Sequence, residues 1–354
     1  MRAENAGTED WWIYQGTGVP HDGIAELPEP PAWRVFGKPS GTVGSDLAIP
    51  PVQRSSGSTA RRLGRVKQAS AYQADERELH LVNLALHLRR PLLITGKPGV
   101  GKSTLAYAVA HELRLGQVLR WPITSRSTLR DGLYTYDAIG RLYDAGMRQG
   151  AFAQEGSTGN ETPGIGRYLR LGPLGTALLP WRHPRVLLID EIDKSDIDLP
   201  NDLLNVFEEG EFEIPELSRM SAGDQTVMTA DGDSAAVCGG LVACSEFPLV
   251  VLTSNAEREF PSAFLRRCVR LEISTPDEER LAAMVDAHLG ESRESTEARA
   301  EVIAEFSRLQ REEGAELAND QLLNALLMVE RGLWKGTRGR EIIESELMRP
   351  LNES

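Results

Sequence analysis

The chain has few cysteines and no disulfide pattern. Its 354 residues include only three, Cys238, Cys244 and Cys268, and none lies at the C-x-x-C spacing of a metal or redox motif. This scarcity excludes the disulfide-dense framework of a small secreted domain. The simple inference is a protein of the reducing cytoplasm.

Two further absences limit the possible partners. No apolar run approaches the roughly 20 residues of a transmembrane helix, and the N-terminus is acidic and polar rather than signal-like, so we expect no membrane association. The formal net charge is −13, from 39 basic and 52 acidic residues. This balance argues against a generally basic nucleic-acid-binding surface. The length and the hydrophobic share of 41% suit a globular protein of two domains.

The most informative feature that is present is a glycine-rich run. It reads Gly96-Lys97-Pro98-Gly99-Val100-Gly101-Lys102-Ser103-Thr104. Residues 91–95 before it predict a strand and residues 104–110 predict a helix, which is the context of a phosphate-binding loop. Glycines let the backbone N–H groups turn inward, and a helix N-terminus favours anions. We predict a nucleoside triphosphate here, with Lys102 at its outer phosphates and the Ser103 hydroxyl as a ligand of Mg²⁺.

The pattern of apolar segments predicts an α/β fold. Candidate strands are residues 91–95, 117–123, 185–190, 249–254 and 268–273, and a helix is expected over 75–88. Strands that alternate with helices predict a mostly parallel five-stranded sheet with helices on both faces. After residue 273 only helical patterns follow, at 298–309 and 321–329, and a helix start is expected with Thr275 as its N-cap and Glu278 at N3.

These patterns divide the chain into three parts. Residues 1–70 form an aromatic and proline-rich extension with a basic linker from Arg54 to Lys67, and we expect it to be partly disordered. Two roles for it stay open, an arm docked on the body and an arm that binds a partner. Residues 71–275 are expected to form the nucleotide-binding domain. Residues 276–354 are expected to form a small, all-helical lid.

Polar residues follow two of the apolar strands. Asp190 and Glu191 close the third strand, and Asn255 follows the fourth. Since parallel strands end at one edge of a sheet, all three are expected beside the glycine-rich loop. Asp190 would hold Mg²⁺, Glu191 would orient or deprotonate the attacking water, and Asn255 would hold that water or the γ-phosphate. A capping acidic pair and ordinary turn chemistry are the structural alternatives.

Two arginines, Arg266 and Arg267, lie just before the fifth strand. Arginine stabilises the charge on a phosphoryl group in transfer, and it can be supplied by a neighbouring subunit. The alternative is a surface pair held in salt bridges.

The order of these motifs resembles that of an AAA+ ATPase module, from about residue 71 to the C-terminus. Within AAA+, Gly172-Pro173-Leu174 and the run 201–210 are similar to the MoxR group of the helix-2-insert clade, which is related to the dynein-type AAA domain. The long stretches 125–184 and 211–248 match the inserts of that clade, the second being long enough for a β-hairpin.

The resemblance implies a ring, commonly a hexamer, with ATP and Mg²⁺ between subunits. It makes Asn255 the sensor 1 residue and Arg267 the arginine finger, with Arg266 as the runner-up. It also implies chaperone-like work on a partner protein carrying a von Willebrand factor A domain. Gln321 stands where many relatives carry a sensor 2 arginine, which predicts slow basal hydrolysis. The alternative function is a nucleotide-gated scaffold or switch that hydrolyses rarely.

Overall fold

The computed structural model describes residues 10–37, 47–49, 69–152, 164–220, 223–289, 296–312, 317, 319–331 and 347–349. The basic linker from Arg54 to Lys67 lies outside these residues. So does Gly290, where the first lid helix is expected to stop.

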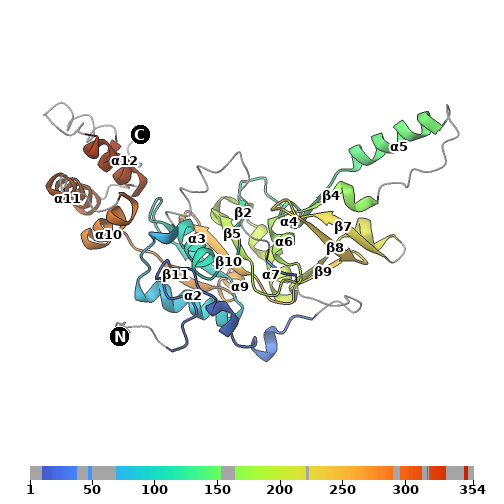
Figure 1. The fold of residues 1–354 in the computed structure, drawn as a ribbon, viewed down its shortest axis with the longest axis horizontal. Coiled ribbons are helices and arrows are strands. Elements are labelled where there is room, and N and C mark those ends of the chain that lie inside the picture. The colour runs from blue at the N-terminus through green and yellow to red at the C-terminus, as the bar shows by residue number, and fades with distance from the viewer. Residues whose placement is uncertain are drawn as a thin grey trace.

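A parallel sheet forms the centre of the molecule (Figure 1), in the order β11-β1-β10-β5-β2. Its strands are β1 (Leu92–Thr95), β2 (Leu119–Pro122), β5 (Val186–Asp190), β10 (Leu249–Ser254) and β11 (Val269–Glu272), and each pairs in parallel with its neighbours. Every residue of β5 and β10 is buried, as in a strand covered on both faces. The predicted five-stranded parallel sheet is therefore confirmed.

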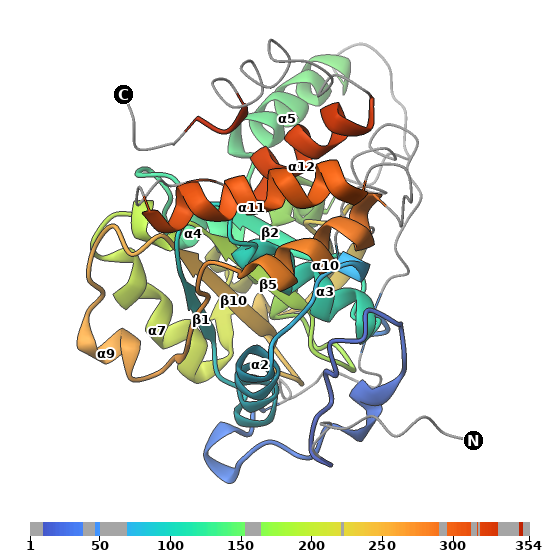
Figure 2. The same ribbon diagram turned by 90° about the vertical axis from the view of Figure 1, so that its left-hand side faces the viewer.

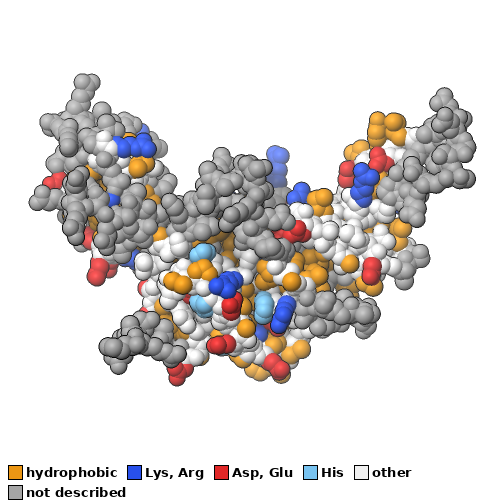
Figure 3. Space-filling model, in the orientation of Figure 1, with side chains coloured by type: hydrophobic (Ala, Val, Ile, Leu, Met, Phe, Trp, Pro, Cys, Tyr) orange, Lys and Arg blue, Asp and Glu red, His pale blue; other side chains and the backbone are white. Residues whose placement is uncertain are grey.

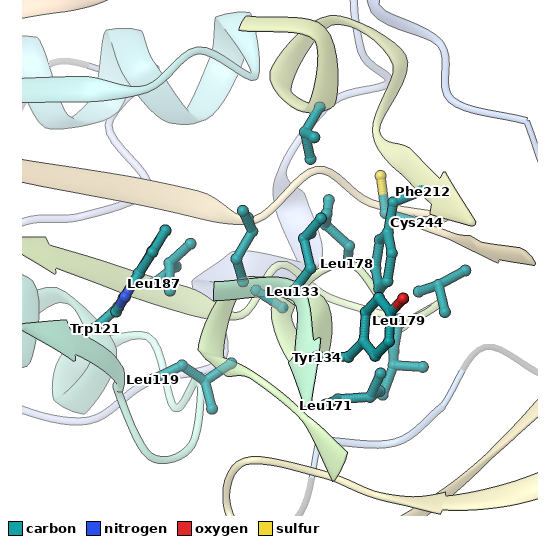
Figure 4. Close-up of a cluster of buried hydrophobic side chains, with 14 of the residues drawn as sticks. Leu119, Trp121, Leu133, Tyr134, Leu171, Leu178, Leu179, Leu187, Phe212 and Cys244 are labelled. Carbon is teal, nitrogen blue, oxygen red and sulfur yellow. The ribbon is translucent and has the colours of Figure 1, made fainter. Parts of the chain in front are cut away.

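Helices cover both faces of this sheet, and a hydrophobic core lies on each face. Alternate residues of a strand point into one core or the other. Val186 and Leu188 point into a core shared with α2 (Glu76–Leu88) and α3 (Lys102–Glu112). Leu187 and Ile189 point into the other core, with α6 (Pro173–Ala177) and α7 (Leu199–Glu209). Figure 4 shows part of this second core, where Leu133 and Leu178 lie between the side chains of β2 and β5 and those of the insert strands.

The two long inserts form a second layer beside the sheet. β3 (Tyr134–Tyr136), β4 (Leu169–Leu171), β7 (Asp224–Met228) and β8 (Ser234–Cys238) make a four-stranded sheet, and β6 (Glu211–Glu213) pairs with β9 (Leu241–Ala243). The antiparallel pair β7–β8 is the hairpin expected within residues 211–248. The short helix α4 (Leu129–Leu133) leads from β2 to β3, and α8 (Pro215–Ser218) connects β6 to β7.

Helix α5 (Ala138–Phe152) projects away from the body on the side opposite the lid helices (Figure 1). Four large apolar side chains at its start are exposed: Ile139, Leu142, Tyr143 and Met147. Their spacing of three, four and eight residues from the first places them along one face of the helix. Figure 3 shows hydrophobic side chains gathered there.

The lid is helical, with α10 (Glu278–Leu289), α11 (Thr296–Glu312) and α12 (Asn319–Glu330) packed around their own core, which includes Leu281, Val302 and Phe306. The predicted N-cap of its first helix was wrong. Asp277, and not Thr275, accepts a hydrogen bond from the N–H group of Arg280 at 2.8 Å. Asp is an equally good capping residue, and its carboxylate is placed at the first free N–H groups.

Residues 10–37 form an irregular arm with two short 3₁₀ turns, Gly23–Glu26 and Ala32–Arg34 (Figure 2). Its first part lies against α2 and α3, and Arg34 donates to the carbonyl oxygen of Phe207 in α7 at 2.9 Å. Asn83 of α2 is fully buried and holds both N–H groups of Ile13 and Tyr14 at 2.8 and 2.9 Å. Glu112 of α3, with no exposed surface, accepts backbone N–H groups of residues 15, 16 and 18 at 2.7–3.0 Å. The described part of the arm is thus built into the body.

All three cysteines are free thiols. Within the described ranges, no helix combines the length and the hydropathy that crossing a membrane demands.

Replacing Asn83 by Ala should destabilise the protein by about 1–3 kcal/mol, because the two arm N–H groups would stay buried without an acceptor. Chemical denaturation measures the loss. Asn205→Ala, at an exposed position of α7, is the matched control and should stay within about 0.5 kcal/mol of the parent. Equal stability of the two variants would show that the arm is not held by Asn83.

Candidate functional site

The glycine-rich loop connects β1 to α3 through a backbone that only glycine adopts easily. Gly96, Gly99 and Gly101 have φ of 153°, 75° and 99°. A Cβ atom on Gly96 would lie 2.4 Å from the carbonyl oxygen of Ile273. The loop therefore depends on glycine both for its conformation and for its close approach to the end of β11.

Lys102, at the start of α3, points back into this loop. Its Nζ donates to the carbonyl oxygens of Gly96 and Lys97 at 2.7 and 2.8 Å and to Oδ1 of Asn255 at 2.8 Å. Burial lowers the pKa of Lys102, and the nearby carboxylates of Asp193 and Asp190 oppose that shift. The ammonium is thus held in the concave side of the loop, where an anion would meet it.

Asp190 ends β5, and its carboxylate accepts hydrogen bonds from three side chains: Ser103, Thr253 and Arg120. The Ser103 and Thr253 hydroxyls donate to its Oδ1 at 2.7 and 2.8 Å. Arg120 of β2 donates to its Oδ2 from Nε at 3.1 Å and from a terminal nitrogen at 2.6 Å. Burial would raise the pKa of Asp190, but the hydrogen bonds from Ser103, Arg120 and Thr253 outweigh it and lower the pKa. The carboxylate is therefore ionised at neutral pH.

Glu191, the next residue, adopts the left-handed backbone conformation, with φ of 62° and ψ of 50°. Its N–H group donates to Thr253 Oγ1 at 2.9 Å. The side chain is about half exposed at 46% and forms an ion pair with Lys194 at 2.9 Å. A non-glycine residue pays a conformational cost for this geometry, and such costs are concentrated at functional sites. The turn separates the two adjacent carboxylates and gives each different surroundings.

Asn255 follows β10 and is fixed from two sides. Its N–H group donates to Asp193 Oδ2 at 2.8 Å, and its side-chain nitrogen donates to Glu257 at 3.2 Å. Its Oδ1 accepts from Lys102, as described above. The amide is thus held beside the loop, close to the ends of β1 and β5.

A cavity of about 420 Å³ opens over these groups and lies between the loop, residues 71–73 and the lid. Its walls include Lys102, Ser103, Asp190, Glu191 and Asn255. The lid adds Arg280 and Met284 from α10 and Asn319 and Leu323 from α12. The N–H group of Asn319 also donates to the carbonyl oxygen of Gly99 at 3.3 Å, so the lid touches the glycine-rich loop directly.

The remaining predicted residues lie elsewhere. Arg267, after α9 (Ser262–Leu265), donates to Glu208 at 2.6 Å and to the carbonyl oxygen of Ala263. Arg266 is exposed. Neither arginine lines the cavity of its own chain. Gln321 also does not line it, and its side-chain nitrogen donates to the carbonyl oxygen of Arg349 at 2.9 Å.

Three polar residues of this region were missed by the sequence reasoning: Arg120, Asp193 and Arg280. Arg120 lies between the buried residues Leu119 and Trp121 of β2. Any exposed position of a strand gives this pattern, so it does not indicate a functional residue. Asp193 comes two residues after Glu191, and no spacing rule links it to Asn255. Arg280 pairs with Glu78 at 2.6 Å, some 200 residues earlier in the chain. None of the three positions therefore carried a usable signal in the sequence, since the strand order that brings Arg120 to Asp190 is seen only in the structure.

The family model described as AAA domain (dynein-related subfamily) matches residues 91–268. These residues run from the start of β1 to Cys268 and contain the loop, Asp190, Glu191 and Asn255. No curated protein matches the chain. Among solved structures, the crystal structure of domain III from the Thermotoga maritima replication initiation protein DnaA is similar over 80% of this chain and 98% of that chain, with 14% identity and a TM-score of 0.39.

Asp190→Asn should destabilise the protein at pH 7 by about 1–3 kcal/mol, because charge-assisted hydrogen bonds are lost. The pKa of Asp190 is lower in the folded protein than its ordinary value of 3.8. Its contribution to stability is therefore full above that ordinary value and declines as the pH falls through the lower folded value. Denaturation of both proteins between pH 7 and pH 3 should show the difference shrinking towards the acid end. A difference independent of pH would contradict an ionised Asp190.

Proposed function

Since the chain belongs to the AAA domain family, dynein-related subfamily, we propose that it binds and hydrolyses ATP between the subunits of a ring and uses that turnover to remodel or assemble a partner protein. The observation that carries this proposal is the convergence of Lys102, Ser103, Asp190, Glu191 and Asn255 on one cavity.

The residues present fit an ATP–Mg²⁺ complex. The glycines leave open a cradle of backbone N–H groups, and Lys102 adds a cation on its concave side. The ionised Asp190 and the Ser103 hydroxyl are oxygen donors of the kind that Mg²⁺ prefers, and they already lie 2.7 Å apart. When bound, Mg²⁺ neutralises the charge that develops on the transferred phosphoryl group.

The chain's own groups would then divide the work of hydrolysis. Lys102 would bind the outer phosphates. Glu191, whose carboxylate is half exposed at the cavity, would accept the proton of the attacking water. Asn255, fixed by Asp193 and Lys102, would orient that water. Arg267 would act on a nucleotide held by the neighbouring subunit, because it does not reach the cavity of its own chain.

At a finer level we propose a MoxR-like protein that assembles as a ring, with a hexamer as the expected size. A protein carrying a von Willebrand factor A domain is the partner that this resemblance implies. The exposed apolar face of α5 supports a role of the insert in contacting a polypeptide partner, because four large apolar side chains there are 62–82% exposed.

A nucleotide-gated switch is the second candidate function, and one observation favours it. Gln321 donates to the Arg349 carbonyl group and does not line the cavity, so this position supplies neither a cation nor a contact to the outer phosphates. Nucleotide binding would then change the position of the lid, and the bound ATP would be hydrolysed only slowly. The extent of steady-state turnover distinguishes this function from an ATP-driven remodelling protein.

Glu191→Gln should lower the ATP hydrolysis rate by about 10²–10⁴-fold, because it removes the general base. ATP affinity should stay within a few fold, because Lys102 and the loop are unchanged. Turnover and equilibrium binding of a fluorescent ATP analogue are the two measurements. Glu209→Gln, at an exposed position of α7, is the control. A wild-type protein that binds ATP but shows no turnover, even in the presence of its partner, would favour the switch.

An arginine finger that acts between subunits should allow two inactive variants to restore each other. Arg267→Ala should lose about 10³-fold in turnover while keeping an intact cavity, and Lys102→Ala should lose nucleotide binding while keeping its finger. Mixing them should restore hydrolysis above that of either alone. Arg266→Ala, the adjacent exposed arginine, should be much less affected. If Arg267→Ala alone kept full ATP hydrolysis, and mixing it with Lys102→Ala gave no further increase, Arg267 would not be the arginine finger.

A further inference from the structure

Arg120 of β2 is the one cation in the described cavity wall that contacts Asp190. Three cations line the cavity, Lys102, Arg120 and Arg280. Lys102 is bonded to the glycine-rich loop and Asn255, and Arg280 is paired with Glu78 and Asp75. Arg120 instead places its guanidinium against Oδ2 of Asp190, with donor distances of 2.6 and 3.1 Å.

The pairing of β2 with β5 places Arg120 within reach of Asp190. β2 runs parallel to β5, and Pro122 of β2 is the register partner of Asp190. The long side chain of Arg120 covers the remaining distance to the end of β5, and its side chain is 44% exposed at the cavity. Arginine presents two donors in a rigid fork that suits a carboxylate, whereas lysine offers a point charge.

The two oxygens of Asp190 therefore have separate partners. Oδ1 is held by the neutral hydroxyls of Ser103 and Thr253, and Oδ2 is held by the cation Arg120. A divalent cation at Ser103 and Asp190 would compete with the guanidinium for the same carboxylate and would repel it.

We propose that Arg120 is the counter-cation of Asp190 in the nucleotide-free site and that Mg²⁺ must displace it when nucleotide binds. The inference rests on the proposed nucleotide site and deepens it. Arg120 is then a positioning residue: its two hydrogen bonds hold the metal-binding carboxylate in place before binding, and it raises the Mg²⁺ concentration that binding needs.

The test is the affinity of a fluorescent ADP analogue as a function of Mg²⁺ concentration. ADP keeps hydrolysis out of the measurement. Arg120→Gln should lower the Mg²⁺ concentration at half-maximal gain in ADP affinity by about two- to fivefold, the range for a partly exposed ion pair. The ratio of the ADP dissociation constants without and with Mg²⁺ should rise by a similar factor.

Arg270→Gln is the matched control, since Arg270 is an exposed arginine of β11, in the same sheet, and does not line the cavity. It should leave both values unchanged. If Arg120→Gln fails to fold, Arg120→Lys, which keeps the charge and loses the fork, should show a smaller shift in the same direction.

Two results would overturn the proposal: an unchanged or higher Mg²⁺ requirement in the Arg120 variants, or an equal loss of ADP affinity with and without Mg²⁺, which would make Arg120 a direct phosphate ligand. A wild-type protein that binds no nucleotide would instead refute the proposed function itself. The two failures are therefore distinguishable.

Discussion

The hydrogen bonds to the Asp190 carboxylate are the interaction on which the rest of the site depends. Three elements meet at this side chain: β2 through Arg120, the start of α3 through Ser103, and β10 through Thr253. An ionised carboxylate at this depth is stable only with such partners. The same contacts fix the end of β5, and so the turn that places Glu191 over the cavity.

The sheet explains why these groups meet. β1, β5 and β10 are adjacent and parallel, so the loop after β1, the carboxylates after β5 and the amide after β10 must emerge at one edge. The lid closes the other side of the cavity through its contact with Gly99. Arg267 does not line that cavity and is paired with Glu208, as the salt-bridge alternative to an arginine finger describes.

The central sheet was predictable from the sequence because its signals are local. Buried parallel strands are continuous apolar runs, and a glycine-rich loop between a strand and a helix has few structural alternatives. The sequence pointed to Thr275 rather than Asp277 as the N-cap of α10. Both are good capping residues, and only the backbone geometry selects one of them. The catalytic roles of Glu191, Asn255 and Arg267 stay predictions.

Long-range polar pairs explain most of what the sequence did not show. Asn83 and Glu112 occur in helices whose apolar periodicity gives no reason to expect buried polar side chains, and their partners lie some 70 to 97 residues earlier in the arm. Arg120 and Arg280 are similar cases, since each finds its carboxylate in another part of the chain. A pattern read along one segment carries no information about such partners.

We propose above all that ATP binds at the Asp190 edge of the sheet and joins subunits into a ring. Sedimentation velocity of the Glu191→Gln variant, with and without ATP–Mg²⁺, tests it most directly, because this variant should hold ATP without consuming it. We expect a nucleotide-dependent shift from a small species to a closed ring, and no shift when Lys102 is also replaced by Ala. A protein that binds ATP and stays monomeric at all concentrations would contradict it.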